Sequence, residues 1–165
     1  MLAGFVTPPF TEDLSGRLLI LNNDHAGELS YKTAEGFRAL IQAASHVRAD
    51  ASGLALIVAF NEACSYDNPN FHWLAARFPR FNYIDRVVVS AAARGRGLAR
   101  TLYGELEAET RVQGRERLVC EINAVPANPR SDAFHAALGF SPVGEQHLED
   151  RGKTVRYWAK ELGFP

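Results

Sequence analysis

The chain has 165 residues, which is the length of one domain built around a single hydrophobic core. Hydrophobic residues make up 47% and charged residues 22%, a composition that excludes a disordered or fibrous protein. The formal net charge of -1 provides no overall basic field of the kind that nucleic-acid binders use. We therefore expect one globular domain over residues 1–165 that does not bind nucleic acid.

The cysteine content and the N-terminal segment exclude two further classes. Cys64 and Cys120 belong to no CxxC motif and to no Cys/His ligand spacing, so we expect no metal site. Residues 1–9 lack the basic start and the apolar stretch of a signal peptide, and no run approaches the ~18 apolar residues of a membrane span. We expect a cytoplasmic protein without a membrane partner.

The first half of the chain alternates apolar runs with turn residues. Residues 18–22 are a short apolar run ended by Asn22 and Asn23, which predicts a first strand. A helix capped by Thr33 follows, and its apolar positions recur at helical spacing as far as Val47. Residues 54–60 show no polar alternation, which predicts a central strand buried on both faces. Residues 61–79 are expected to form a loop with a short helical piece.

The second half predicts a βαβ unit and a closing hairpin. Residues 83–89 and 118–122 are predicted strands, and the helical pattern over 94–113 lies between them, so the two strands should be parallel. A helix over 131–138 closed by Gly139 follows, and then strands over 143–148 and 154–158 flank a turn at 149–152. The fold class is therefore α/β, with a mixed central sheet flanked by helices and one parallel βαβ unit.

The junction between strand and helix carries the segment Arg94-Gly95-Arg96-Gly97-Leu98-Ala99. Its glycines let the backbone approach a ligand, and the first helical turn offers N–H groups that lack internal partners. With two arginines beside them, these amides suit a diphosphate. A basic helix start without a ligand is the plain alternative. A dinucleotide-binding turn, with Glu121 on the ribose, is weaker because position 100 is Arg100 rather than glycine.

Two segments together resemble one known family. Arg94-x-x-Gly97-x-Ala99 is similar to the Gln/Arg-x-x-Gly-x-Gly/Ala turn of the GNAT superfamily of N-acetyltransferases. Residues 128–140, which run from Asn128 to Leu138-Gly139-Phe140, resemble the second segment of that superfamily. The resemblance covers about residues 54–160.

The resemblance implies acetyl-CoA as cosubstrate, no metal, and direct transfer of an acetyl group to an amine. It places the pyrophosphate on residues 94–99 and the pantetheine arm along the strand that ends at Val89, with a backbone N–H near Val88 or Val89 polarising the thioester carbonyl. The residues that it implies for cofactor binding are Val87, Val88, Val89, Arg94, Gly95, Arg96, Gly97, Leu98, Ala99, Asn128, Ser131, Phe134 and His135.

The resemblance identifies the catalytic residues less directly than the cofactor-binding residues. His135 stands where many family members carry a tyrosine that acts as general acid, and it could donate a proton to the CoA thiolate or only pack nearby. Asp85 and Glu121 are the candidate bases, Glu62 directly after the central strand is a further one, and each has a salt bridge or a solvated strand end as the alternative. Strand alternation places Asp85 on one face with Val87 and Val89, and Glu121 on one face with Asn123.

The acceptor side is expected to include Glu62, Tyr66, Trp73 and Asn123. The aromatic residues between 61 and 85 could line a pocket, or could equally form a satellite core over the sheet. Asp67, with Asp85 and Glu62, would suit a cationic amine, either a small molecule or a peptide. Monomer and homodimer both remain open. The alternative function is a CoA-binding module or sensor that has the fold but no turnover.

Overall fold

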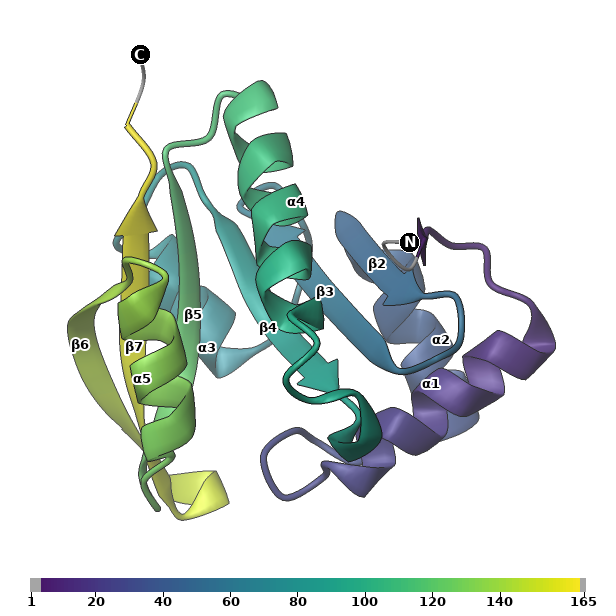
Figure 1. Ribbon diagram of the computed structural model, residues 1–165. Coiled ribbons are helices and arrows are strands. Elements are labelled where there is room, and N and C mark those ends of the chain that lie inside the picture. The colour runs from purple at the N-terminus through teal and green to yellow at the C-terminus, as the bar shows by residue number, and fades with distance from the viewer. Residues whose placement is uncertain (1–3, 164–165) are drawn as a thin grey trace.

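The computed structural model describes residues 4–163, which form a seven-stranded sheet in the order β1-β2-β3-β4-β5-β7-β6 with helices on both faces (Figure 1). The strands are β1 (Phe5–Val6), β2 (His46–Asp50), β3 (Ala55–Asn61), β4 (Asn82–Val89), β5 (Arg117–Val125), β6 (Ser141–Leu148) and β7 (Lys153–Glu161). The helices are α1 (Glu12–Asp24), α2 (Ala34–Ala43), α3 (Pro69–Ala75), α4 (Leu98–Val112) and α5 (Pro129–Ala137), with short 3-10 turns η1 (Ala91–Ala93) and η2 (Glu149–Arg151).

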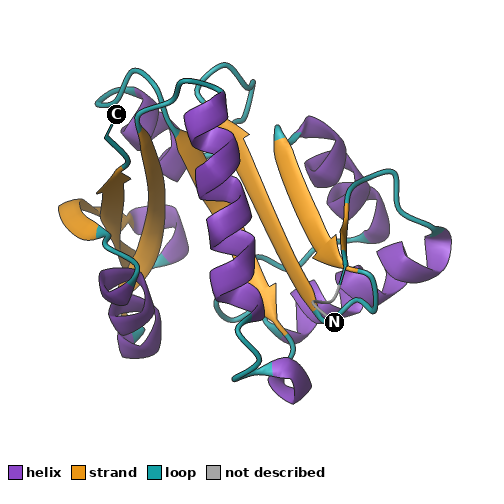
Figure 2. Cartoon of the chain, turned by 45° about the horizontal axis from the view of Figure 1, so that its top comes forward, coloured by secondary structure: helices purple, strands orange, loops and turns teal. Residues whose placement is uncertain are grey.

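Helices cover both faces of the sheet, as the turned view in Figure 2 shows, and a hydrophobic layer lies on each face. On β3, Leu56, Val58 and Phe60 pack toward α1, α2 and α3, whereas Ala55, Ile57 and Ala59 pack toward α4. β3 is therefore buried on both faces, which confirms the expectation for residues 54–60 and explains why this strand lacks polar alternation.

The strand predicted over residues 18–22 is wrong, because this run lies inside helix α1. The Thr11 hydroxyl caps the helix by accepting a hydrogen bond from the Leu14 N–H, and two acidic residues follow in the first turn. Leu14, Leu18 and Leu21 are buried on one side, while Ile20 is 63% exposed. The spacing of the buried residues is helical, and the run of consecutive apolar residues concealed it.

The second helix ends earlier than its apolar pattern predicts. Thr33 caps α2 by accepting from the Gly36 N–H, as expected, but the helix stops at Ala43. Val47 lies instead on β2, which pairs antiparallel with β3. The sequence-based prediction missed β2 because Val47 stands at a helical spacing from Ala44 and is also compatible with a strand.

The predicted βαβ unit is confirmed, and its two strands part soon after they begin. β4 and β5 are parallel partners only at Asn82–Ile84 and Leu118–Cys120. Figure 1 shows the strands diverging toward the end where α5 and the loop between α1 and α2 lie. Beyond Ile84, the β5 side of β4 has no strand partner and is free to face a ligand.

A β-bulge in β4 accompanies this divergence. On β3, Val58 pairs with Arg86 and Ala59 pairs with Ile84, so Asp85 is an extra residue without a partner on β3. An extra residue shifts the alternation of side chains along the strand. The prediction that Asp85 shares a face with Val87 and Val89 is therefore wrong. Its side chain joins Tyr66 and Arg86 on the side of the sheet that α1 and α3 cover.

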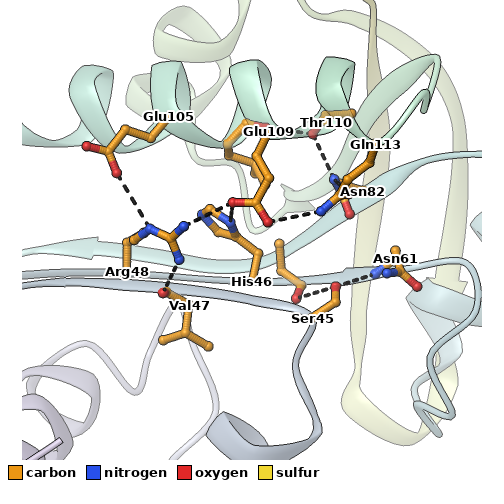
Figure 3. Close-up of polar contacts among 12 residues, drawn as sticks. Ser45, His46, Val47, Arg48, Asn61, Asn82, Glu105, Glu109, Thr110 and Gln113 are labelled. Carbon is orange, nitrogen blue, oxygen red and sulfur yellow. Dashed lines mark hydrogen bonds and ion pairs between the residues drawn. The ribbon is translucent and has the colours of Figure 1, made fainter. Parts of the chain in front are cut away.

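A polar network fastens α4 to β2 (Figure 3). The Glu109 carboxylate of α4 accepts hydrogen bonds from His46 Nδ1 at 2.8 Å and from Arg48 at 3.0 Å, and Gln113 also donates to it. The His46 side chain is only 1% exposed, so Glu109 satisfies a buried donor. This bridge holds α4, and with it the turn before the helix, against the sheet.

Replacing Glu109 by alanine should therefore lower the free energy of unfolding by about 1–3 kcal/mol, because a buried imidazole N–H loses its acceptor. Glu105→Ala is the matched control on the same helix: its carboxylate is 43% exposed and lies 3.7 Å from Arg48. The control should lie within about 0.5 kcal/mol of the wild type in urea denaturation. Equal losses in both variants would contradict this role of Glu109.

Candidate functional site

Two connected hollows lie where β4 and β5 part. The outer hollow has a volume of about 260 Å³ and extends from Val87–Val89 to Arg94 and to the start of α5. The inner hollow, of about 110 Å³, lies deeper between the strands and contains Glu121 and Asn123. The two share one set of walls: Glu28, Leu29, Val87, Asn128, Ser131 and His135.

The outer hollow ends at the first turn of α4. Gly95 and Gly97 have φ values of +79° and +76°, a left-handed conformation that glycine adopts without strain. Gly97 is the N-cap of α4, so the N–H groups of the first helical turn face outward without a capping side chain. Arg94 is exposed and lines the hollow, and Arg130 of α5 lines it from the opposite side. This end of the site is built to hold an anion.

The structure brings most of the predicted cofactor residues together. Those that line the outer hollow are Val87, Val88, Val89, Arg94, Ala99, Asn128, Ser131, Phe134 and His135. Gly95, Arg96 and Gly97 form the adjoining exposed turn, and Leu98 packs into the core beneath it. Asn128 also caps α5 by accepting from the Ser131 N–H at 3.3 Å, which explains why an asparagine precedes this helix.

His135 is buried and paired with Tyr103 of α4. His135 Nδ1 lies 2.7 Å from the Ser131 carbonyl oxygen, which can only accept, so Nδ1 carries the proton. Burial lowers the pKa of His135, although the hydrogen bond to Ser131 opposes that shift, and the ring is neutral. Nε2 therefore accepts from the Tyr103 hydroxyl at 2.7 Å. Both side chains line the inner hollow. The sequence analysis gave Tyr103 no role and missed this pair.

Glu121 of β5 is the carboxyl group inside the inner hollow. Burial, and then the negative charge of Asp85, raise its pKa to about 8, while Tyr83 and Lys153 oppose the shift. Glu121 Oε2 and the Tyr83 hydroxyl are both buried and make no hydrogen bond within residues 4–163. A buried carboxyl with a free oxygen and a pKa near neutrality is a suitable general base.

Asp85, the other predicted base, already has its hydrogen bonds within the fold. Its carboxylate accepts from Arg86 Nε at 2.7 Å and from the Tyr66 hydroxyl. Arg86 in turn donates to Asn22 at the end of α1 and to Ser30 in the following loop. Asp85 reaches the inner hollow as part of a buried ion pair.

The predicted acceptor residues divide between the site and the core. Asn123 lines the inner hollow together with Glu121, as expected from their alternation on β5. Tyr66 stacks on Phe60, and Trp73 stacks on Tyr157 with ring centroids 4.0 Å apart, so both belong to the aromatic layer over the sheet.

Glu62 accepts from Arg115 at 2.8 Å and from the Phe81 N–H, and it lines neither hollow. Asp67 is exposed and pairs with His72 at 3.0 Å. The acidic acceptor patch expected from the sequence is thus not assembled: Glu62 and Asp67 have partners away from both hollows, and Asp85 reaches the inner hollow already paired with Arg86.

The sequence analysis missed lining residues from two further segments of the chain. His25, Glu28 and Leu29 come from the end of α1 and the loop after it, and Lys153 comes from the start of β7. A third hollow, of about 840 Å³, lies apart from these between α1 and α2, where Phe10, Leu19 and Phe37 line it.

Two classes of feature are absent from residues 4–163. None of the helices described there has both the length and the apolar character needed to cross a bilayer. In the same part of the chain, His, Cys, Asp and Glu side chains nowhere gather in the groups of three that could hold a metal ion.

The raised pKa of Glu121 predicts a specific dependence of stability on pH. A carboxyl whose pKa rises from 4.5 to about 8 on folding takes up a proton between these values, so the free energy of unfolding falls as the pH increases across that range. Glu121→Gln removes this effect. The stability of the variant relative to the wild type should increase from about pH 5 to pH 9, by about 1.4 kcal/mol for each pKa unit of the shift.

The exposed Glu149→Gln variant serves as the control, because solvent surrounds that side chain in both states. Its stability should parallel that of the wild type in urea denaturation at each pH. A Glu121→Gln curve that also parallels the wild type would show that Glu121 titrates like an exposed carboxylate.

Comparison with known proteins agrees with this geometry. The family model described as the acetyltransferase (GNAT) family matches residues 30–140. No protein with curated annotation matches the chain in sequence. A solved N-acetyltransferase from Staphylococcus aureus Mu50 is similar in fold, with a TM-score of 0.68, 18% identity, and coverage of 97% of this chain and 99% of that one.

Two further solved structures share the fold. A ribosomal-protein-alanine N-acetyltransferase from Brucella melitensis has a TM-score of 0.67 and 19% identity, with 96% of this chain and 99% of that chain covered. N-acetylglutamate synthase from Neisseria gonorrhoeae, complexed with coenzyme A and N-acetyl-glutamate, has a TM-score of 0.69 and 14% identity, with 98% and 35% covered. Because the family model spans more than half of the sequence, and the parallel βαβ unit and its glycine turn have the predicted form, the chain belongs to the GNAT acetyltransferase family.

Proposed function

We propose that the protein transfers an acetyl group from acetyl-CoA directly to a primary amine, in the cytoplasm and without a metal. The observation that carries this function is the pair of adjoining hollows, which share lining residues and extend from Arg94 and the start of α4 to the Glu121 carboxyl. One end of that cavity suits a pyrophosphate, and the other holds a base. A CoA sensor without turnover would not need a carboxyl whose pKa is raised to about 8 at the inner end.

The residues present fit coenzyme A. The glycine turn with the first amides of α4 would hold the pyrophosphate, and Arg94 and Arg130 would add opposite charge from two sides. The unpaired side of β4 at Val87–Val89 would bond the pantetheine arm and polarise the thioester carbonyl through a backbone N–H. Acetyl-CoA, when bound, supplies an acyl group on a thiolate leaving group.

Glu121 is the proposed general base. The acceptor amine attacks the thioester carbonyl carbon, so a C–N bond forms, the C–S bond breaks, and the amine loses a proton. With a pKa of about 8, Glu121 is mostly protonated at pH 7, and its ionised form, roughly a tenth of the total there, can accept that proton directly or through one water. Asp85 contributes its negative charge, which raises the basicity of Glu121, rather than accepting the proton itself.

His135 acts together with Tyr103 in this proposal. Because Nδ1–H is bonded to Ser131 and Nε2 accepts from Tyr103, neutral His135 has no proton directed at the cavity. The Tyr103 hydroxyl has one proton, which it donates to Nε2, so it can stabilise the departing thiolate only when it rotates away from His135 and breaks that hydrogen bond. A thiol has a reference pKa of about 8.5, so the thiolate is stable enough to leave with such modest assistance.

Cofactor binding is tested by Arg94→Ala combined with Gly97→Glu. The first substitution removes a cation, and the second places a carboxylate on a left-handed residue at the helix start, where the pyrophosphate would lie. Isothermal titration should show acetyl-CoA binding to the wild type and none to the double variant.

Arg38→Ala is the control, because it removes one positive charge from α2, away from both hollows. Its affinity for acetyl-CoA should equal that of the wild type. Circular dichroism of the double variant confirms that α4 is still folded, and undiminished binding by this folded variant would overturn the pyrophosphate assignment.

The base is tested by the turnover of Glu121→Gln. With an amine acceptor and an assay for released CoA thiol, kcat should fall about 10²–10⁴-fold, because the amide cannot accept the amine proton. Acetyl-CoA affinity should stay unchanged, since the pyrophosphate and pantetheine contacts are intact. A variant with a wild-type kcat would exclude Glu121 as the base.

A further inference from the structure

The Tyr83 hydroxyl is a buried polar group that acetyl transfer, as proposed, does not use. Tyr83 of β4 is fully buried, and in the part of the chain that the structure describes its hydroxyl has no hydrogen-bond partner. The same is true there of Oε2 of Glu121. Buried polar groups are nearly always paired, so two neighbouring groups without partners require an explanation.

The strand geometry makes these two groups neighbours. Tyr83 is the register partner of Val119 in the parallel pairing of β4 with β5, and both pack into the layer on the side of α1 and α3. Glu121 follows Val119 by two residues, so alternation places it on the same side. Its register partner on β7, Tyr157, packs into that layer as well. A tyrosine and a glutamate placed diagonally on one face of adjacent strands are within reach of each other.

Tyr83 itself lies outside the cavity. Glu121 lines the inner hollow, whereas Tyr83 lines neither hollow. The ring of Tyr83 packs among aromatic side chains, with ring centroids 6.4 Å from Tyr66 and 6.0 Å from Phe71. Tyr83 is therefore not placed to touch the acceptor or the thioester, and it can influence the reaction only through Glu121.

Toward the Glu121 carboxylate, Tyr83 can act as a hydrogen-bond donor. Burial, and then the charge of Glu121, raise the pKa of Tyr83 well above its ordinary value, so the hydroxyl keeps its proton. The nearby Tyr66 hydroxyl is already donated to Asp85. Ionisation of Glu121 thus creates a charged acceptor beside the Tyr83 proton.

Other titratable groups face Glu121 from several elements. The charged groups that line the inner hollow with it are Asp85 and Arg86 on β4, Glu28 after α1, and Lys153 on β7. The uncharged groups are His135 on α5, Tyr103 on α4, Tyr66 before α3, and Tyr157 on β7. All of these stay in place when Tyr83 is replaced by phenylalanine, so a change in the titration of Glu121 reports on the lost hydroxyl.

We propose that Tyr83 is a positioning residue for the base: its hydroxyl donates a hydrogen bond to the ionised Glu121 carboxylate, which holds that group in place and favours its ionised form. The inference rests on the proposed role of Glu121 in acetyl transfer. A hydrogen bond to a charged group stabilises the charge, so it counteracts the burial that raises the pKa of Glu121. Tyr83 thereby increases the fraction of the protein that has a competent base near neutral pH.

Tyr83→Phe removes the hydroxyl and keeps the ring. Urea denaturation compares each protein with its own Glu121→Gln version from about pH 5 to pH 10, so that changes in packing cancel in the difference. In the wild type, the stability of Glu121 relative to Gln should fall as the pH rises from 4.5 and level off above about 8. In Tyr83→Phe, the levelling point should move up by at least about one pH unit, because a hydrogen bond to a charged group is lost.

Turnover tests the positioning role with the same variant. With the amine acceptor used for Glu121→Gln and the assay for released CoA thiol, the rising limb of kcat against pH should move up by the same amount. At pH 7, kcat of Tyr83→Phe should fall about tenfold, and at alkaline pH it should approach the wild-type value. A purely structural role of Tyr83 would instead lower kcat by one factor at every pH.

Tyr157→Phe is the matched control. Tyr157 is also fully buried and is the register partner of Glu121, but its hydroxyl already lies 2.8 Å from Asn70 Oδ1 and 2.9 Å from Gln146 Oε1. Its stability and kcat curves should keep the wild-type midpoints.

Unshifted curves for Tyr83→Phe, or an equal shift in Tyr157→Phe, would overturn the pairing of Tyr83 with Glu121 and leave the base standing. A shift of the stability curve without one in kcat would overturn the positioning role. If Glu121→Gln keeps a wild-type kcat, the base assignment fails, and the positioning role fails with it.

Discussion

The bulge at Asp85 is the constraint on which the site depends. One extra residue on β4, held by Arg86 and Tyr66, accompanies the point at which β4 leaves β5. Without this parting, β5 would occupy the edge of Val87–Val89 that is available to the pantetheine arm. The same Arg86 binds Asn22 and Ser30 and so fixes the loop that supplies Glu28 and Leu29 to the cavity. A buried ion pair is a weak source of stability, and here it orders the walls of a site.

Burial shifts the pKa values of two side chains in the site, Glu121 and His135. Glu121 sits between the parted strands, where low solvation and the charge of Asp85 keep its pKa near neutrality. His135 is buried in the last turn of α5, where burial lowers its pKa and the Ser131 carbonyl fixes the tautomer. The replacement of the family's tyrosine by His135 thus introduces a hydroxyl from another helix, that of Tyr103, into the cavity.

The sequence predicted well which residues line the outer hollow, because most of them lie in two segments that are local in the chain. The glycine turn and residues 128–140 each carry their geometry in a few consecutive residues, and the helix between the two strands fixes their order. The apolar run at 18–21 was misassigned as a strand because four consecutive apolar residues suit either element, and only the burial of Leu14 reveals the helical face.

The acceptor half could not be predicted in this way because its walls come from distant loops. Glu28 and Lys153 line the inner hollow together only because the loop after α1 and the start of β7 reach the same end of the sheet. The bulge also cannot be predicted from strict alternation of side chains along β4. Relative to that alternation, it moves every side chain after Asp85 to the other face of the sheet. Composition suggested an acidic patch, whereas pairing in the fold removes those acids.

A crystal structure of the protein with acetyl-CoA tests the central claim most directly. The pyrophosphate should lie on the first turn of α4 beside Arg94, and the thioester should lie between β4 and β5, within reach of Glu121 directly or through one water. Acetyl-CoA bound instead in the groove between α1 and α2, or a thioester separated from Glu121 by an intact pairing of β4 with β5, would contradict the account.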